Sequence, residues 1–389
     1  MCRLRQTNLW VLFAVFAMLL TGCTTTPDLP RKKVPNPVFP MPPEQPRFIF
    51  EKAIYSSIDV VKEDSTSAFR RFATGEQLKG EGFAKPFDVV VHKGRIFVSD
   101  TARRMVLLLD PAGKGRFTEI GMEEPGRLYL PLGLAKDKMG NLYVCDITAK
   151  RVTIYDRDGN YLRAIGGRRY FRRPSGVAVD PDGKRVYVVD TGGVDNQDHR
   201  VRVFDAMSGE HLFDIGTRGG EDGQFNLPRD AVISPYNGLL YVVDGGNFRV
   251  QVFKQDGTFV RKFGAVGRRT GQFSRPKGIA VDRWGNVYVV DTAFGNVQIF
   301  SPDGQLLMFL GNRSSKDGPA KYMLPAGVDV DEDGRLYLVD QFFRKVEIYK
   351  PTELMGPADK TLTQTKEGEP AKAAAKQAAP ESGTPPSGK

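Results

Sequence analysis

A segment of about twenty residues recurs six times along this chain, and this repetition restricts the folds that the chain can adopt. One copy, NVYVVDTAFGNVQIFSPDGQ (286–305), alternates apolar and polar residues, breaks, alternates again and ends in a Pro-Asp-Gly turn. An aspartate closes the first run of every copy, at Asp100, Asp146, Asp190, Asp244, Asp291 and Asp340. Successive aspartates lie 44 to 54 residues apart, a period typical of stacked supersecondary units.

Each repeated unit is predicted to form four short strands. In the fifth unit these strands are GIAVD, NVYVVD, VQIFS and LLMFLG, separated by turns that carry Gly, Pro, Asn or Asp. Period-two alternation of β-branched and aromatic residues indicates strands, and no segment of the repeat region shows a convincing helical period. Four antiparallel strands, repeated around an axis, form a propeller blade. The sequence therefore predicts an all-β fold, a six-bladed β-propeller of four-stranded antiparallel blades over residues 47–350.

The sixth unit lacks a fourth strand, because VEIYK (346–350) runs directly into PTELMGPADK. A strand-like segment, RFIFEKAIYS (47–56), precedes the first unit. An open ring would leave sheet edges unpaired, so we predict that this N-terminal strand completes the sixth blade and closes the ring. The alternative is an independent edge strand.

The N-terminus is typical of an exported protein. Arg3 and Arg5 precede an apolar run of 11 residues (10–20), which is too short to cross a bilayer about 30 Å thick and fits a signal peptide over residues 1–22. The LTGC sequence resembles a bacterial lipobox, and this resemblance implies cleavage before Cys23 and lipidation of Cys23. We expect a membrane-anchored lipoprotein, placed in the outer membrane if the organism has one. The alternative is an ordinary signal peptide.

The two ends of the chain differ in composition from the repeats. Residues 24–46 contain eight prolines, so residues 23–46 are predicted to form an extended tether after the lipidated cysteine. Residues 351–389 are rich in Ala, Lys, Pro, Gly and Thr and are predicted to be a disordered tail. About 300 residues remain for one domain, which is enough for a core.

Cysteine usage agrees with this domain plan. Cys2 would leave with the signal peptide and Cys23 would be lipidated, so Cys145 remains the single thiol and no disulfide can form within one mature chain. Cys145 lies in the predicted second strand of the second unit. We expect it to be a small buried apolar residue rather than a reactive thiol.

Two segments between units carry a family resemblance: GTRGGEDGQFNLPRDAVIS (216–234) and GAVGRRTGQFSRPKGIAVD (264–282). Together with VYVVDTAFGNVQIF they resemble NHL repeats, and the resemblance extends over about residues 83–350. It implies a six-bladed NHL propeller. It implies no single activity, because the family includes RNA binders, sensor domains, adhesion modules and amidating lyases.

Several repeated charged residues are predicted to be structural. Arg151, Arg249 and Lys345 follow the repeat aspartate by five positions, which favours an ion pair or hydrogen bond within the blade. The DRDG, DPDG and DEDG sequences at 156–159, 180–183 and 331–334 resemble fragments of calcium loops but lack the glutamate that such a loop requires. We interpret them as hairpin turns.

The loops between second and third strands should lie on the same face as the crossovers between blades. We call this the loop face, and it gathers basic residues interleaved with aromatic ones, a combination suited to acidic or π-rich partners. The same face is expected to carry Arg229 and Lys277. The candidate binding residues are Arg103, Arg104, Arg168, Arg169, Tyr170, Phe171, Arg172, Arg173, Arg218, Arg268, Arg269, Phe342, Phe343 and Arg344. The formal net charge of +10 agrees with this picture. The alternative is a merely solvated basic face.

These features favour a non-catalytic binding or scaffold module of the cell envelope, with an assembly role that includes the tail as a further possibility. The export signal argues against nucleic acid, so the expected partner is an acidic protein, a peptide or an anionic glycan, bound by a monomeric chain that needs no cofactor.

The competing hypothesis is a metal-dependent lyase or lactonase with its site in the central channel. The chain has three histidines, His92, His199 and His211. They fall in different parts of the repeat, so no three-histidine zinc site is predicted. The innermost strands of most units begin Pro-x-Gly, but the first and fourth units have Asp88 and Asp230 in place of the glycine. These two carboxylates are candidates for a cation or sugar site in the channel; the alternative is that they cap backbone amides.

Overall fold

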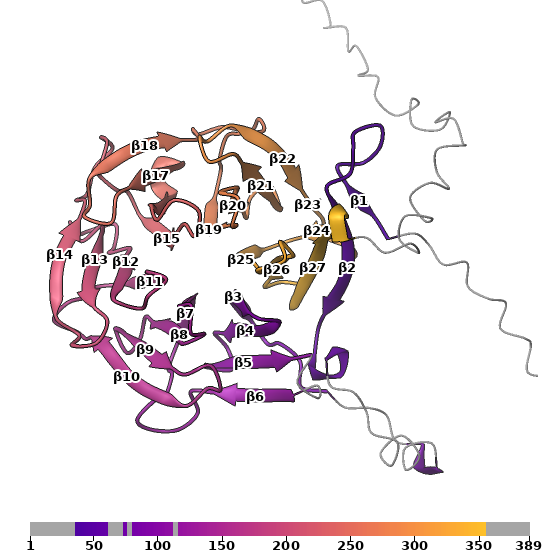
Figure 1. Cartoon of the computed structure of the whole chain (residues 1–389), viewed down its shortest axis with the longest axis horizontal. Helices are drawn as coiled ribbons and strands as arrows, with labels where there is room; N and C mark the ends of the chain where they lie inside the picture. The colour runs from indigo at the N-terminus through magenta and orange to yellow at the C-terminus, as the bar shows by residue number, and fades with distance from the viewer. Residues whose placement is uncertain (1–35, 61–72, 76–79, 112–115, 355–389) are drawn as a thin grey trace, which may run out of the picture. The chain divides into compact units, whose positions relative to one another are not determined.

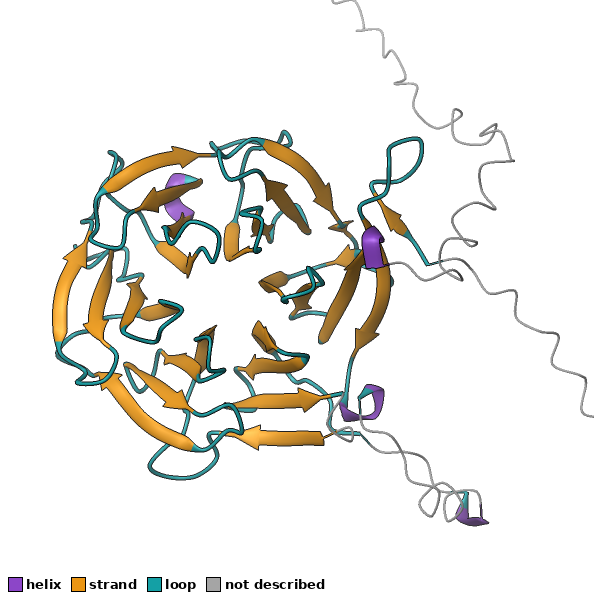
Figure 2. Cartoon of the chain, viewed as in Figure 1, coloured by secondary structure: helices purple, strands orange, loops and turns teal. Residues whose placement is uncertain are grey.

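The computed structural model describes residues 36–60, 73–75, 80–111 and 116–354. Over this part of the chain the fold is all-β, with six antiparallel sheets arranged around a central channel (Figures 1 and 2). No helical segment among the described residues has the length and apolar character required to cross a membrane. The predicted signal peptide, Cys23 and most of the tether and tail lie outside the described residues, so those assignments stay predictions.

Each of the first five blades has four strands in sequence order from the channel outward. Their bounds in blades one to three are β3 (Pro86–His92), β4 (Arg95–Asp100), β5 (Met105–Asp110), β6 (Arg116–Ile120); β7 (Pro131–Lys136), β8 (Leu142–Asp146), β9 (Arg151–Tyr155), β10 (Tyr161–Gly166); β11 (Pro174–Val179), β12 (Arg185–Asp190), β13 (Arg200–Asp205) and β14 (His211–Ile215). Blades four and five comprise β15 (Pro228–Ile233), β16 (Leu240–Asp244), β17 (Arg249–Phe253), β18 (Phe259–Phe263); β19 (Pro276–Val281), β20 (Val287–Asp291), β21 (Asn296–Phe300) and β22 (Leu306–Leu310).

The sixth blade joins the two ends of the described chain. Its strands β25 (Pro325–Val330), β26 (Leu336–Asp340) and β27 (Lys345–Pro351) are followed outward by β2 (Phe48–Ile54) and β1 (Val38–Phe39). Strand β2 pairs antiparallel with β27, which places Ile49 opposite Lys350. The prediction that the N-terminal strand closes the ring is confirmed. The additional strand β1 makes this sheet five-stranded, which the sequence did not indicate.

Short elements connect the blades. A parallel pair, β23 (Asn312–Arg313) and β24 (Lys321–Tyr322), lies in the crossover between blades five and six. The described residues also include three single-turn 3₁₀ helices, η1 (Ser57–Asp59), η2 (Gly245–Asn247) and η3 (Thr352–Leu354).

The repeated aspartate fastens each blade to the crossover that precedes it. In blade five, the fully buried Asp291 carboxylate accepts hydrogen bonds from the backbone N–H groups of Ser274 (2.7 Å) and Arg275 (3.0 Å). It also accepts one from the N–H of Ala293 (2.9 Å) in the loop between the second and third strands. Because one carboxylate accepts hydrogen bonds from both segments, the crossovers and the loops between second and third strands lie on the same face, as predicted. The repeat aspartate is fully buried in all six blades.

Packing between blades supplies the core. Phe225 and Phe273 of the two GQF sequences are fully buried in the crossovers before blades four and five. The Phe225 ring packs against Phe253 on β17, and the Phe273 ring packs against Phe300 on β21. Burial of aromatic rings of this size contributes much of the apolar area between propeller blades.

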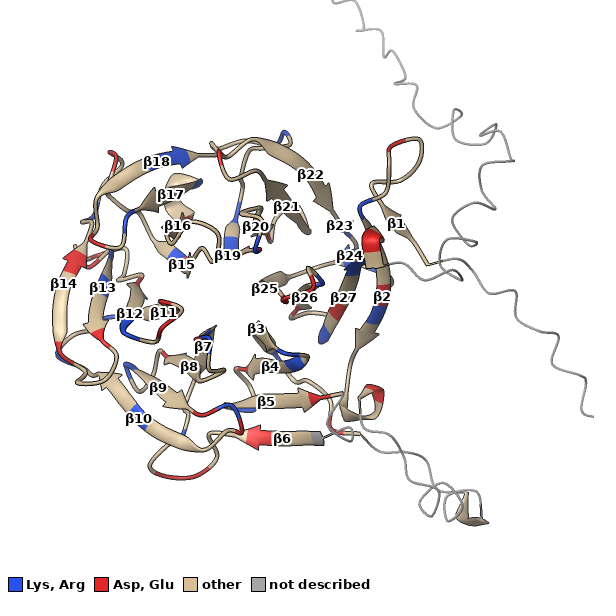
Figure 3. Ribbon diagram, in the orientation of Figure 1, with Lys and Arg blue, Asp and Glu red and all other residues tan. Residues whose placement is uncertain are grey.

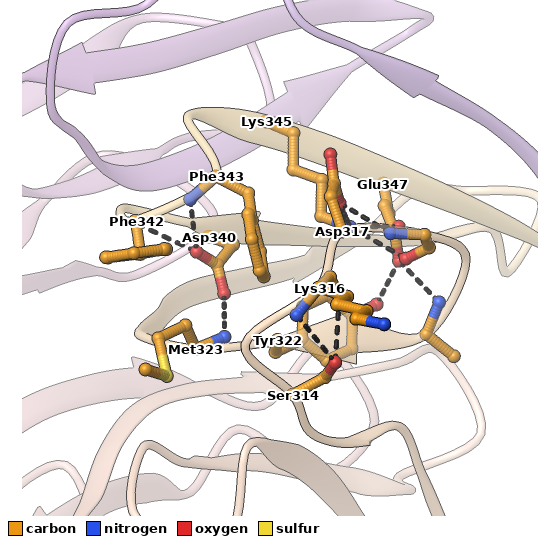
Figure 4. A network of polar contacts seen from close by, with 12 residues as sticks. Ser314, Lys316, Asp317, Tyr322, Met323, Asp340, Phe342, Phe343, Lys345 and Glu347 are labelled. Atoms are coloured by element: carbon orange, nitrogen blue, oxygen red, sulfur yellow. Dashed lines mark hydrogen bonds and ion pairs between the residues drawn. The ribbon is translucent and has the colours of Figure 1, made fainter.

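The predicted turn and ion-pair roles agree with the contacts. The Asp180 carboxylate accepts hydrogen bonds from the N–H groups of Lys184 and Arg185 in its hairpin turn. Arg249 donates from Nε to the Asp244 carboxylate over 2.9 Å. In blade six the ammonium of Lys345 contacts the carboxylates of Asp317 and Glu347 (Figure 4).

Candidate functional site at the channel mouth

The residue after the first proline of each innermost strand faces one cavity of about 250 Å³. These six residues are Phe87, Leu132, Ser175, Arg229, Lys277 and Ala326, one from each blade in order. Leu130, Ile147 and Thr191, which belong to crossovers or to loops after second strands, also line the cavity. The cavity is therefore the mouth of the central channel on the loop face.

The next residue of each innermost strand forms a narrow ring below this mouth. A Cβ atom added to Gly133 would lie 2.8 Å from the Cα of Gly176, and one added to Gly278 would lie 2.5 Å from the carbonyl oxygen of Ala326. These distances are too short for any side chain, so glycine is required at these two positions, where neighbouring innermost strands approach each other.

Asp88 and Asp230 occupy the same ring in blades one and four. The Asp88 carboxylate accepts hydrogen bonds from the N–H groups of Val89 (2.9 Å) and Leu134 (2.8 Å), and Leu134 belongs to the next blade. Asp230 accepts equivalent bonds from Ala231 (2.9 Å) and Ile279 (3.3 Å). Both carboxylates therefore cap amide groups on the free edges of the innermost strands and connect adjacent blades.

Burial changes the proton affinity of both carboxyl groups. Burial, reinforced by the charge of Asp230, raises the pKa of Asp88 well above its usual range. Burial raises the pKa of Asp230 to about 7. Near neutral pH this floor of the cavity thus carries less negative charge than two ordinary carboxylates would.

Three cationic side chains line the cavity above that floor. The Lys277 ammonium lies 4.2 Å from the centroid of the Phe87 ring, which places a blade-five side chain against a blade-one ring. Burial lowers the pKa of Lys277 to about 8, although the nearby Asp88 charge opposes this effect. Burial and the charges of Arg173 and Arg275 lower the pKa of Arg229. Over the described part of the chain, no ion pair involves Arg173, Arg229 or Lys277.

A glycine makes room for Arg229. The residue after the repeat aspartate is Thr101, Ile147, Thr191, Thr292 or Gln341 in the other five blades, but blade four has Gly245. A Cβ atom on Gly245 would lie 2.7 Å from Cγ of Arg229. In blade four the long side chain of Arg229 on the innermost strand therefore lies beside Gly245, which has no side chain. Figure 3 shows basic positions on β15 and β19 where these strands border the channel.

The predicted loop-face arginines divide into two groups. Arg103 is neutralised by Glu81 (2.8 Å) and Glu119 (2.9 Å), Arg172 contacts Asp198 (3.2 Å), and Arg218 donates to the carbonyl oxygen of Asn196 (2.8 Å). The second group is exposed and takes part in no ion pair among the described residues: Arg104, Arg168, Arg169, Arg173, Arg268, Arg269 and Arg344, with Arg275 in addition.

The predicted aromatic residues differ in exposure. Phe342 is 52% exposed and stacks edge to face on the half-buried Phe343, with ring centroids 5.2 Å apart. The Arg169 guanidinium lies over the ring of Tyr170 at 4.5 Å. Phe171 is only 1% exposed and packs against Phe204, so its assignment as a surface contact residue was wrong. The sequence pattern failed there because a ring next to four arginines resembles a surface ring, whereas its side chain turns into the core.

The other end of the channel is a larger and mainly apolar cavity of about 430 Å³. Lys136 and Asp329 form an ion pair there over 2.6 Å, and Asp329 also accepts a hydrogen bond from the N–H of Val91 (2.7 Å). Of the three histidines, His92 borders this cavity, while the other two lie elsewhere. His199 accepts from the N–H of Leu227 (3.2 Å), and His211 contacts Asp214 (2.8 Å) on β14.

The repeat pattern, the sheet topology and the glycine-lined channel together define this chain as a six-bladed β-propeller. The family model for the NHL repeat matches residues 171–204 and 225–253.

Among curated proteins, the chain is 33% identical over 142 residues to the protein brain tumor of Drosophila melanogaster, covering 36% of this chain and 12% of that protein. It is 29% identical over 162 residues to peptidylglycine alpha-amidating monooxygenase of Rattus norvegicus, covering 39% of this chain and 16% of the enzyme. The chain thus matches a small part of the length of either relative.

Two solved structures have the same fold. A Bacteroides thetaiotaomicron protein of unknown function superposes with a TM-score of 0.55 at 15% identity, over 79% of this chain and 76% of that chain. The virginiamycin B lyase of Staphylococcus aureus superposes with a TM-score of 0.50 at 12% identity, over 69% of this chain and 95% of the lyase. At these identities the likeness concerns the fold alone.

Proposed function

We propose that this propeller is a non-catalytic binding or scaffold module of the cell envelope, held by a lipid anchor on Cys23, that binds an acidic partner through its loop face. The single observation that carries the proposal is the group of exposed arginines without carboxylate partners on the face where the basic cavity opens. An acidic protein, a peptide or an anionic glycan would fit this surface.

The physical argument concerns the placement of charge rather than its total. Several basic residues of the opposite face are paired, as in the Arg95–Asp158 contact of 2.8 Å and the Lys138–Asp182 contact of 2.5 Å. Unpaired arginines on one face repel each other and attract carboxylate or sulfate groups, for which the planar guanidinium offers paired N–H donors. Complementary charge of this kind raises the association rate and selects the partner.

The test is crosslinking in cells followed by capture of the chain. A variant with Arg168, Arg268 and Arg269 replaced by glutamate should lose a partner that the wild type captures. A matched control replaces Arg157 and Arg283, exposed arginines of hairpin turns on the opposite face, by glutamate, and should retain it. Equal capture by the wild type and the loop-face variant would contradict the proposal.

The lyase or lactonase alternative gains no support from the site. Asp88 and Asp230 use their carboxylate oxygens to cap backbone amides, and the described residues contain no group of three or more His, Cys, Asp or Glu side chains placed to hold a metal ion. The binding module is therefore the function that the geometry supports best.

A further inference from the structure

We propose that the channel mouth is a subsite for one small anionic group, a carboxylate or a phosphate, attached to an apolar body. This inference rests on the proposed binding function and specifies what the centre of the loop face would recognise. It follows from three features of the cavity: its cations, its apolar wall and its floor.

The cations come from one side of the ring. Arg229 and Lys277 hold equivalent positions on the innermost strands of adjacent blades, β15 and β19, and Arg173 reaches the same cavity from the crossover that precedes β11. Since none of the three is in an ion pair within the described chain, their charges are mutually repulsive. An anion between them would remove this repulsion and accept charge-assisted hydrogen bonds.

The opposite side of the ring is apolar. Phe87, Leu132 and Ala326 occupy the equivalent positions in blades one, two and six, and Leu130 and Ile147 extend this wall toward the loop face. Because the Phe87 ring already contacts the Lys277 ammonium, Leu132 and its apolar neighbours would cover the body of a ligand whose charged end faces Arg229 and Lys277. A volume of about 250 Å³ lies below the usual range of about 300 to 1,000 Å³ for drug-sized ligands, so the subsite would hold one small group of a larger partner.

The floor compensates the cations only in part. The oxygens of Asp88 and Asp230 accept hydrogen bonds from four backbone amides of the innermost strands. These contacts fix the carboxyl groups against the channel wall. Burial raises the pKa of both carboxyl groups, and the charge of Asp230 raises that of Asp88 further, so they are not fully charged near neutral pH. The mouth therefore retains an excess of positive charge.

Gly245 provides an independent reason to regard Arg229 as placed for binding. The other blades carry a larger residue at this position, and a side chain here would meet both Cγ and Nε of Arg229, at 2.7 and 3.2 Å from the Cβ. Replacing Gly245 by threonine, the residue found in blades one, three and five, would displace the guanidinium without changing any charge.

The experiment measures binding of benzoate, phenyl phosphate, inorganic phosphate and benzyl alcohol to the full chain by calorimetry and by NMR. Benzoate and phenyl phosphate should bind, inorganic phosphate should bind more weakly, and benzyl alcohol should not bind. Arg229→Gln and Lys277→Met should each weaken benzoate binding by roughly tenfold, the usual effect of losing one charge-assisted hydrogen bond. Gly245→Thr should weaken it without loss of charge, and Arg157→Gln, on the opposite face and outside the cavity, should leave it unchanged.

The outcomes separate this inference from the proposed function. Absence of benzoate and phenyl phosphate binding, or undiminished binding in the Arg229→Gln/Lys277→Met double variant, would overturn the subsite. Equal binding of inorganic phosphate and phenyl phosphate would overturn the role of the apolar wall. If the probes bind as expected but the glutamate variant of the loop face still captures its partner, the subsite stands and the wider loop-face function fails.

Discussion

The ammonium of Lys345 lies 2.6 Å from the carboxylate of Glu347, and both side chains are completely buried in blade six (Figure 4). Glu347 also accepts hydrogen bonds from the Tyr322 hydroxyl (2.5 Å) and from the N–H of Ala320 (3.1 Å). At the equivalent positions of blade five, counted from the repeat aspartate, stand the neutral residues Asn296 and Gln298. The same site in two blades is thus filled once by an ion pair and once by two amides.

This relationship predicts a strong coupling between the two charges. Lys345→Asn leaves the Glu347 carboxylate buried without its main cation and should lower the free energy of unfolding by about 3–5 kcal/mol. The Lys345→Asn/Glu347→Gln double variant reproduces the blade-five pair and should be more stable than the single variant. Chemical denaturation of the four proteins of the cycle measures the coupling, and additive effects would contradict it.

A second prediction concerns the closing strand. Ile54 of β2 is fully buried in the cluster that joins blades one and six. Ile54→Ala should lower the free energy of unfolding by about 2–5 kcal/mol, because it removes apolar contacts and leaves a cavity. Leu162→Ala, on the outer strand β10 where Leu162 is 43% exposed, is the matched control and should change stability by less than about 0.5 kcal/mol. Similar losses in both variants would show that β2 is not part of the core.

The channel carboxyl groups predict a dependence of stability on pH. Their pKa values are raised in the folded protein, to about 7 for Asp230, above the value of about 3.9 in an unfolded chain. The folded state therefore binds more protons between about pH 4 and 7, and the contribution of these groups to stability falls as the pH rises through this window. Asp230→Asn, which cannot ionise, should flatten the curve of unfolding free energy against pH. An unchanged slope would contradict the assignment.

Anion binding at the channel mouth should also depend on pH, but above pH 7 rather than below it. Burial lowers the pKa of Lys277 to about 8, so Lys277 loses its charge as the pH rises through that value. The affinity for benzoate should therefore decrease between about pH 7 and 9, whereas the Lys277→Met variant should lack this decrease. Calorimetric titrations at several pH values measure the difference, and parallel curves would exclude Lys277 as a ligand-binding group.

A final prediction concerns the thiol of Cys145. This side chain is fully buried on β8, and burial raises its pKa well above the usual range. In a Cys2→Ser/Cys23→Ser variant, Cys145 should resist a thiol reagent at pH 8 in the folded protein and react at once after denaturation. Rapid reaction of the folded protein would show that β8 is accessible.

The sequence predicted the blade architecture because the strand pattern and the repeat aspartate act locally, within one unit and its crossover. It also predicted ring closure, since one unit lacked a strand and one unassigned strand remained. It did not predict β1, whose two residues Val38 and Phe39 lie in a proline-rich segment with little strand pattern.

The candidate site was predicted less completely for a physical reason. Arg229 and Lys277 were recognised as basic, but their convergence depends on pairing six innermost strands around one axis. The signal was present in the sequence: both follow the first proline of an innermost strand, as Phe87 does in blade one. Aligning the units on that proline would have placed all three at the channel mouth. Whether Phe171 was exposed could not be read from its neighbours, since burial is decided by contacts with Phe204.

The pairing of β2 with β27 also determines when the propeller can close during folding. Arg335 and Glu51, which contact each other across this sheet over 3.1 Å, are 284 residues apart in the sequence. Contacts between such distant residues slow folding, because a long loop must be closed before they form. The edge of β2 that pairs with β27 must therefore wait for its partner until the last blade has been made, although β1 can already pair with the other edge. During that interval the open edge can pair with strands of other chains.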